Sequence, residues 1–189
     1  ISKQINFIFG DNLTFVEFGS GSDEKIRIFL NNNVKFYIPL DISFDFIKEA
    51  SETFGSSTIV VAIDVKKRFF GKKVIWTNSG KVSCNYSPIE FAKIAEDQGA
   101  GEIIIQSIER DGGMLGYDIE LIKEVSRSVT IPVVALGGAG SVKDLYEAKH
   151  IGNANALAAG SMFVFQGSRK GVLINYPEVD ELSSLRQKS

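Results

Sequence analysis

Two aspartates, Asp64 and Asp111, stand where strands of a predicted sheet come to an end. Asp64 follows the continuous, mostly β-branched run TIVVAI at 58–63, which is typical of a strand buried on both faces of a parallel sheet. Asp111 lies beyond the next apolar run, at 103–105. Because partial burial raises the pKa of a carboxyl, such a pair could act as general acid and general base. The structural alternative for Asp64 is a carboxylate that pairs with Lys66 or caps a turn. For Asp111 it is a surface turn, with Glu109 and Arg110 forming a surface ion pair.

Two loops of small residues are candidate anion sites. The first contains Gly137 and Gly138 and lies between a strand-like run and a helix start, and the second contains Gly160 and Ser161 after the last strand-like run. Glycines let the backbone approach an anion closely, and a helix N-terminus offers unpaired N–H groups. Two such loops after neighbouring strands are typical of the phosphate site of (β/α)8 barrels. The alternative is that the glycines only allow tight strand-to-helix turns.

Strands and helices alternate from about residue 58 onwards, which favours an α/β protein with a parallel sheet. Strand-like runs occupy 58–63, 103–105, 131–136 and 154–159, and helix-like segments begin at the capping residues Ser87, Asp118 and Ser141. Before residue 58 the weaker pattern predicts strands at 12–18 and 34–38 and helices at 24–30 and 46–54. The basic segment 66–73 suggests a hairpin loop, either solvated or acting as an electrostatic lid over a phosphorylated substrate.

Composition narrows the classes of function. A chain of 189 residues with 44% hydrophobic content suits one domain, 1–189, with a sizeable core. The net charge of −2 argues against nucleic acid as a partner. One cysteine and one histidine leave almost no material for disulfides, metal sites or histidine triads, so we expect no metal and no cofactor. The N-terminal residues lack the long apolar region of a signal peptide, and no run is apolar enough to span a membrane, which predicts a cytoplasmic protein.

Five motifs, in their order and spacing, resemble the cyclase subunit of imidazole glycerol phosphate synthase. They are VVAIDVK at 60–66, GAGEI at 99–103, SIERDG at 107–112, GYD at 116–118 and GGAG at 137–140. The resemblance is strong from about residue 45 to 177. It implies a (β/α)8 barrel that receives ammonia from a glutaminase partner. The ammonia closes an imidazole ring and an aminoimidazole ribotide is released, in histidine biosynthesis.

The resemblance also implies roles for individual residues. Asp64 matches the catalytic aspartate of the family's fifth strand, and Asp111 matches an aspartate that lines the same pocket after the sixth strand. We therefore expect both to be catalytic, facing one another across the mouth of the barrel. The residues expected to bind substrate or its phosphate groups are Ser107, Gly137, Gly138, Gly160 and Ser161.

Several departures from the family pattern leave alternatives open. The family's first two βα units, with the strand-one aspartate, have no counterpart here, and 18–21 and 37–40 differ from the family's glycine triplet and Asn-Thr pair. Gln106 and Leu136 replace small hydroxyl residues, and the tail 160–177 is similar to paralogues that are thought to pass ammonia to a sugar amidotransferase in surface-polysaccharide synthesis. The three hypotheses are a cyclase subunit, such a paralogue, and a non-catalytic scaffold for a glutaminase.

Overall fold

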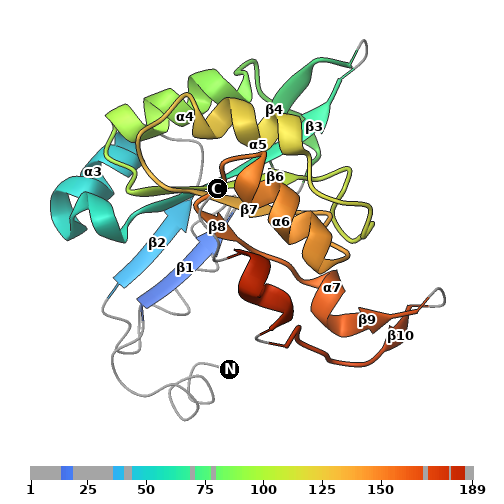
Figure 1. Ribbon diagram of the computed structural model, residues 1–189. Helices are drawn as coiled ribbons and strands as arrows, with labels where there is room; N and C mark the ends of the chain where they lie inside the picture. The colour runs from blue at the N-terminus through green and yellow to red at the C-terminus, as the bar shows by residue number, and fades with distance from the viewer. Residues whose placement is uncertain are drawn as a thin grey trace.

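A six-stranded, mainly parallel sheet forms the centre of the fold (Figure 1). The computed structural model describes residues 14–18, 36–40, 44–68, 71–77, 80–167, 170–178 and 180–185. The strand order is β5 (Val82–Ser83), β4 (Lys73–Thr77), β3 (Val60–Lys67), β6 (Glu102–Ser107), β7 (Val133–Leu136) and β8 (Ala156–Leu157). β3, β6, β7 and β8 are parallel, whereas β4 and β5 extend the sheet in antiparallel pairing. The predicted α/β class with a parallel sheet is confirmed.

Three helices connect successive strands of this sheet and begin where the sequence predicts. α4 (Pro88–Asp97) precedes β6, α5 (Ile119–Ser126) lies between β6 and β7, and α6 (Val142–His150) lies between β7 and β8. The side chains of Ser87, Asp118 and Ser141 each accept a hydrogen bond from the backbone N–H three residues later. These caps satisfy N–H groups that have no partner inside the helix, which fixes the starting residue of each helix.

The remaining elements lie at the two ends of the chain. β1 (Thr14–Phe18) and β2 (Phe36–Leu40) pair in parallel as a separate two-stranded sheet, and α3 (Phe44–Phe54) and the 3-10 turn η1 (Ser56–Thr58) lead into β3. After β8 come α7 (Ser161–Val164), the hairpin of β9 (Phe165–Gln166) and β10 (Gly171–Val172), and η3 (Glu181–Leu185). The predicted helix at 24–30 lies outside the described residues.

The six-stranded sheet has two unlike faces. Alternate residues of β3 and β6, such as Ile63 and Ile103 with 0% exposure, are buried with apolar residues of α4 and α5. The residues between them are only partly buried and point to the opposite side. We call this second side the open face; it carries Val60, Ala62 and Asp64 of β3, Ile104 and Gln106 of β6, and Leu136 of β7.

β3 is longer than the apolar run 58–63 predicts. The strand continues to Lys67 because its last three residues pair antiparallel with β4, from Val65 opposite Ile75 to Lys67 opposite Lys73. Asp64 therefore lies inside the strand rather than just beyond it. Its backbone is held in the ladder with β6, opposite Gln106, so the Asp64 carboxyl is carried by a rigid element.

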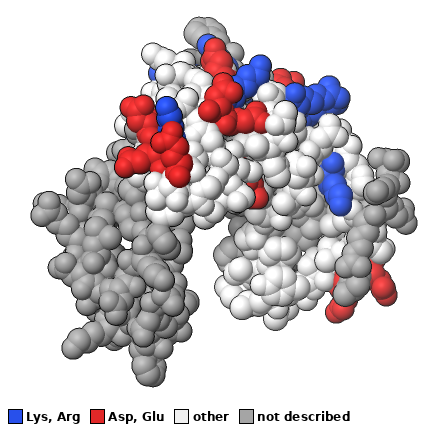
Figure 2. Space-filling view, turned by 90° about the vertical axis from the view of Figure 1, so that its left-hand side faces the viewer, with Lys and Arg blue, Asp and Glu red and all other residues white. Residues whose placement is uncertain are grey.

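Acidic and basic side chains lie side by side along the upper part of the face shown in Figure 2. The rest of the described surface in that view is mostly uncharged. None of the helices among the described residues has both the length and the apolar character needed to cross a membrane.

Truncation of an isoleucine to alanine should lower the free energy of unfolding by different amounts on the two faces of β6. Ile103→Ala removes a side chain with 0% exposure and should lower the free energy of unfolding by about 2–5 kcal/mol, because it leaves a cavity under the helices. Ile104→Ala, the matched control on the open face, should cost clearly less. Urea unfolding of both variants measures the difference, and equal losses would contradict the assignment of the faces.

Candidate active site at the carboxyl ends of the strands

The pairing of the strands places Asp64 in a row of three side chains on the open face. Asp64 lies opposite Gln106 in the β3–β6 ladder, and Gln106 lies opposite Leu136 in the β6–β7 ladder. Neighbouring strands are about 4.8 Å apart, so an amide lies next to the Asp64 carboxyl and an apolar side chain next to the amide. The row below it, Ala62, Ile104 and Val134, is entirely apolar.

Burial raises the pKa of Asp64 above its usual range, and the negative charge of Asp111 raises it further. The sequence left open an ion pair of Asp64 with Lys66, but the Lys66 ammonium lies over the Trp76 ring, 5.1 Å from its centroid. In the described parts of the chain no cation forms a salt bridge with Asp64. A carboxyl in this environment holds its proton at higher pH than an exposed one, as a general acid or base requires.

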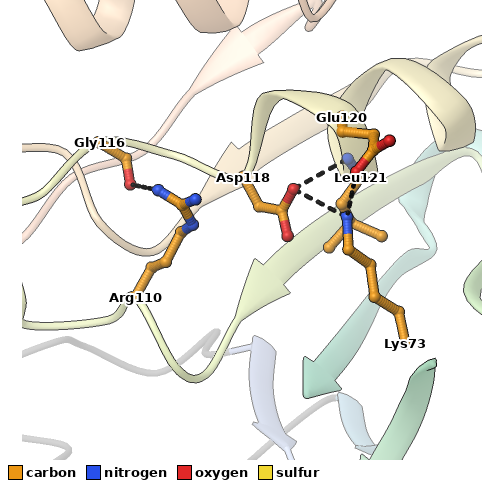
Figure 3. A network of polar contacts seen from close by, with 6 residues as sticks. All are labelled: Lys73, Arg110, Gly116, Asp118, Glu120 and Leu121. Carbon is orange, nitrogen blue, oxygen red and sulfur yellow. Dashed lines mark hydrogen bonds and ion pairs between the residues drawn. The ribbon is translucent and has the colours of Figure 1, made fainter. Parts of the chain in front are cut away.

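Asp111 lies on the loop 108–118, which is anchored to the end of β6. The backbone N–H groups of Arg110 and Asp111 both donate to the Ser107 carbonyl, at 3.1 Å each. Arg110 does not form the ion pair with Glu109 that the sequence offered as an alternative, because its Nη1 donates to the Gly116 carbonyl at 3.1 Å (Figure 3). The Asp111 side chain is exposed, yet it is near enough for its negative charge to raise the pKa of Asp64.

Ser107 is the one polar residue in the buried class among the described residues. It lies opposite Val65 in the β3–β6 ladder, so its side chain lies on the helix-packed face and not with Asp64. Its carbonyl, however, supports the turn that carries Asp111. A direct contact of Ser107 with substrate stays a prediction.

Gly137 and Gly138 let the loop after β7 press against the loop after β6. Their φ angles are 89° and 108°, in the region that favours glycine. A Cβ on Gly137 would lie 2.8 Å from the Ser107 carbonyl oxygen, and one on Gly138 would overlap the Gly116 carbonyl. The packing explanation for these glycines therefore holds. The backbone N–H groups of Gly138 and Ala139 nevertheless have no hydrogen-bond acceptor within the part of the chain that the structure describes.

The N-terminus of α6 offers fewer unpaired N–H groups than the sequence led us to expect. The Asp144 carboxylate accepts the N–H of Gly140 at 2.9 Å and that of Ser141 at 2.8 Å. The helix thus caps itself with its own negative charge. Among the described residues the N–H groups of Val142 and Lys143 in the first turn have no acceptor, and an anion at this loop could bind to them as well as to Gly138 and Ala139.

The loop after β8 meets the other two loops at the same end of the sheet. The Tyr117 hydroxyl donates to the Ala158 carbonyl at 2.8 Å, which joins the loop 108–118 to the end of β8. A Cβ on Gly112 would lie 4.0 Å from the Ser161 Oγ, whereas Gly160 is exposed with open space around it. The structure therefore brings the loops that carry Asp111, Gly137, Gly138 and Ser161 together beside the end of β3.

The basic segment 66–73 forms the hairpin that the sequence suggested, but its last lysine is not free to cover a substrate. The Lys73 ammonium bonds Asp118 at 2.9 Å and Glu120 at 3.4 Å (Figure 3). Asp118 also caps α5, so one carboxylate joins the helix start to β4. Sequence reasoning missed this pair, as it missed Tyr117 as a link between two loops and Arg110 as a contact within the loop 108–118. No group of three or more His, Cys, Asp or Glu side chains in the described regions is arranged to hold a metal ion.

Parallel strands that bring a half-buried carboxyl and glycine loops to one end of a sheet are typical of α/β barrel proteins, whose active sites lie at that end. A family model described as histidine biosynthesis protein matches residues 22–168. The chain belongs to this family, whose fold is a (β/α)8 barrel.

The chain is similar to several proteins whose names refer to one enzyme. It is 40% identical over 143 residues to a protein of Pseudomonas aeruginosa provisionally named imidazole glycerol phosphate synthase subunit hisF2, covering 76% of this chain and 56% of that protein. It is 52% identical over 114 residues to imidazole glycerol phosphate synthase subunit HisF of Sulfurisphaera tokodaii, covering 60% of this chain and 45% of that protein. A provisionally named hisF3 of Vibrio vulnificus is 41% identical over 136 residues, which cover 71% of this chain and 52% of that protein. The chain spans about half the length of the curated relatives it matches.

The raised pKa of Asp64 predicts that this residue destabilises the fold at neutral pH. A carboxyl with a higher pKa in the folded state binds its proton more tightly there, so folding is favoured as the pH falls through that pKa. Asp64→Asn should therefore increase the free energy of unfolding at pH 8. The gain should shrink towards pH 3, where the carboxyl is protonated in both states. Urea unfolding at both pH values checks this, and a loss of stability at pH 8 would contradict it.

The two lysine ion pairs predict different stability effects. Lys73→Met should lower the free energy of unfolding by about 1 kcal/mol, because the Lys73 and Asp118 side chains are only 16% and 13% exposed. Lys143→Met, the control, removes an 81% exposed side chain that lies 3.7 Å from Glu147 and should have no measurable effect. Thermal and urea unfolding measure both variants. Equal stability of the two variants would mean that the ion pair of Lys73 with Asp118 does not stabilise the hairpin.

Proposed function

We propose that this chain carries the cyclase site of an imidazole glycerol phosphate synthase. The reaction uses glutamine-derived ammonia to convert a bis-phosphorylated ribulosyl ribotide to imidazole glycerol phosphate and aminoimidazole ribotide, in histidine biosynthesis. The observation that carries the proposal is Asp64: a half-buried carboxyl of raised pKa, beside the loops that carry Asp111 and the glycines. Membership of the histidine biosynthesis family supports the same reaction.

The chemistry requires protons to move in both directions. Ammonia loses its protons as its nitrogen forms two new bonds to carbon. One bond displaces a carbonyl oxygen, which takes up protons and leaves as water. The other bond closes the ring and displaces the nitrogen of the aminoimidazole ribotide, which takes up protons and leaves as an amine. Asp64 exchanges a proton more readily near neutral pH than an exposed carboxyl, because burial and Asp111 both raise its pKa. In the proposal, Asp64 and Asp111 share these transfers as acid and base.

Substrate binding rests on backbone and hydroxyl donors. In the proposal, Gly137 and Gly138 together with Gly160 and Ser161 bind one phosphate of the substrate, and Ser107 holds the loop between them. The N–H groups of Gly138 and Ala139 that lack an acceptor in the described structure are suitable donors. A glutaminase subunit is the proposed source of ammonia, and the relatives are themselves named as subunits.

The test supplies ammonium salt and the ribulosyl ribotide to the protein, so that no glutaminase is needed. Asp64→Asn should lower the turnover rate by about 100-fold or more, since general acid–base groups contribute roughly 10²–10⁴. The control is Asp97→Asn, an exposed aspartate at the end of α4. Absence of turnover by the wild type would contradict the cyclase proposal, whereas full activity of Asp64→Asn would remove only the role of Asp64.

A second candidate is a paralogue that passes ammonia to a sugar amidotransferase in surface-polysaccharide synthesis. It is favoured by Gln106 and Leu136, which stand in the same row as Asp64 and replace the small hydroxyl residues expected there. Neighbouring genes for polysaccharide synthesis, in place of genes for histidine synthesis, would support it. Binding of a glutaminase without turnover of either kind would leave the scaffold hypothesis.

A further inference from the structure

Lys170 reaches from the C-terminal hairpin to the loop that carries Asp111. It lies in the turn between β9 and β10, where its backbone N–H donates to the Gly167 carbonyl at 3.1 Å. Its Nζ donates to the Gly112 carbonyl at 3.0 Å, across 58 residues of sequence. The hairpin projects beyond α7 in Figure 1, so this bond connects a peripheral element to the candidate active site.

Gly112 lies close to two polar side chains. The Lys170 Nζ donates to its carbonyl oxygen, and a Cβ on Gly112 would lie 4.0 Å from the Ser161 Oγ. An ammonium group has three N–H donors, and the Gly112 carbonyl takes one of them. The other two donors have no acceptor among the described residues and are available to a ligand at this loop.

Lys170 adds positive charge to a rim that also carries negative side chains. Arg110 and Lys170 are positive, whereas Asp111 and Asp144 are negative. Removal of Lys170 would take away one of these positive charges, so a phosphate group would be attracted less strongly. Because Lys170 is exposed, its single bond to a carbonyl contributes little to stability. Its main effect is to place a positive charge at this rim.

We propose that Lys170 binds a phosphate monoester of the substrate beside Ser161. This proposal rests on the proposed function, because it completes the phosphate site of that reaction. Lys170 adds a charged side chain that comes from the β9–β10 hairpin and not from the glycine loops. Lys170 is a compact charge on a flexible stem, which suits contact with a phosphate without demanding one fixed geometry.

Inorganic phosphate is the probe, added at pH 7.5 and constant ionic strength to the ¹⁵N-labelled protein. The amide signals of Gly112, Gly138 and Ser161 report binding. Lys170→Met should weaken phosphate binding by about tenfold, or about 1.4 kcal/mol, because it removes a charged hydrogen-bond donor. Lys170→Arg keeps the charge and should retain most of the affinity. Lys143→Met, which removes an exposed lysine of α6, should bind phosphate as the wild type does.

The outcomes separate the two proposals. Wild-type binding that is unchanged in Lys170→Met would overturn the role of Lys170 and leave the glycine loops as the phosphate site. Absence of any saturable shift in the wild type would overturn the phosphate site itself, and Lys170 with it. Amide signals far from the site show whether each variant is folded. If Lys170→Met is misfolded, the comparison of the wild type with Lys170→Arg is used in its place.

Discussion

The parallel pairing of β3 with β6 and of β6 with β7 is the constraint on which the candidate site depends. Side chains alternate between the two faces of a strand, so a slip of one residue would move Asp64 from the open face to the helix-packed face. The register is held by the burial of Ile63 and Ile103, which are fully covered by helices. Hydrophobic packing on one face thus determines which side chains meet on the other. The row of Asp64, Gln106 and Leu136 is a consequence of that packing.

The candidate site also depends on the close approach of three backbone loops. The Ser107 carbonyl accepts two N–H groups of its own loop and also lies where a Cβ on Gly137 would collide. Any larger residue at Gly137 or Gly138 would push the loop after β7 away from the loop that carries Asp111. The glycines therefore have a structural role whether or not they contact a ligand. A phosphate-binding role adds to this explanation and does not replace it. Phosphate binding uses the backbone N–H groups, whereas the close packing depends on the absence of a side chain at the glycines.

Local signals in the sequence predicted a large part of the fold. The caps at Ser87, Asp118 and Ser141 are confirmed because each depends on residues within one helical turn. The extension of β3 to Lys67 was not predicted, since it depends on pairing with β4 and not on an apolar run. Contacts such as Lys73 with Asp118 and Lys170 with Gly112 join residues 45 and 58 positions apart. Nothing in a single sequence specifies such pairs, because they follow from how the elements pack. The catalytic and phosphate-binding roles themselves remain predictions.

The protonation of Asp64 depends on where the nearby cations are directed. Lys66 lies over the Trp76 ring, Lys73 is bound to Asp118, and Arg110 donates to the Gly116 carbonyl. Each of these groups could lower the pKa of a neighbouring carboxyl, and each has a partner elsewhere. Burial and the charge of Asp111 consequently act on Asp64 without opposition from a salt bridge within the described residues. A single salt bridge to Asp64 would stabilise the fold and lower the pKa of that carboxyl, and would oppose the effects of burial and of Asp111.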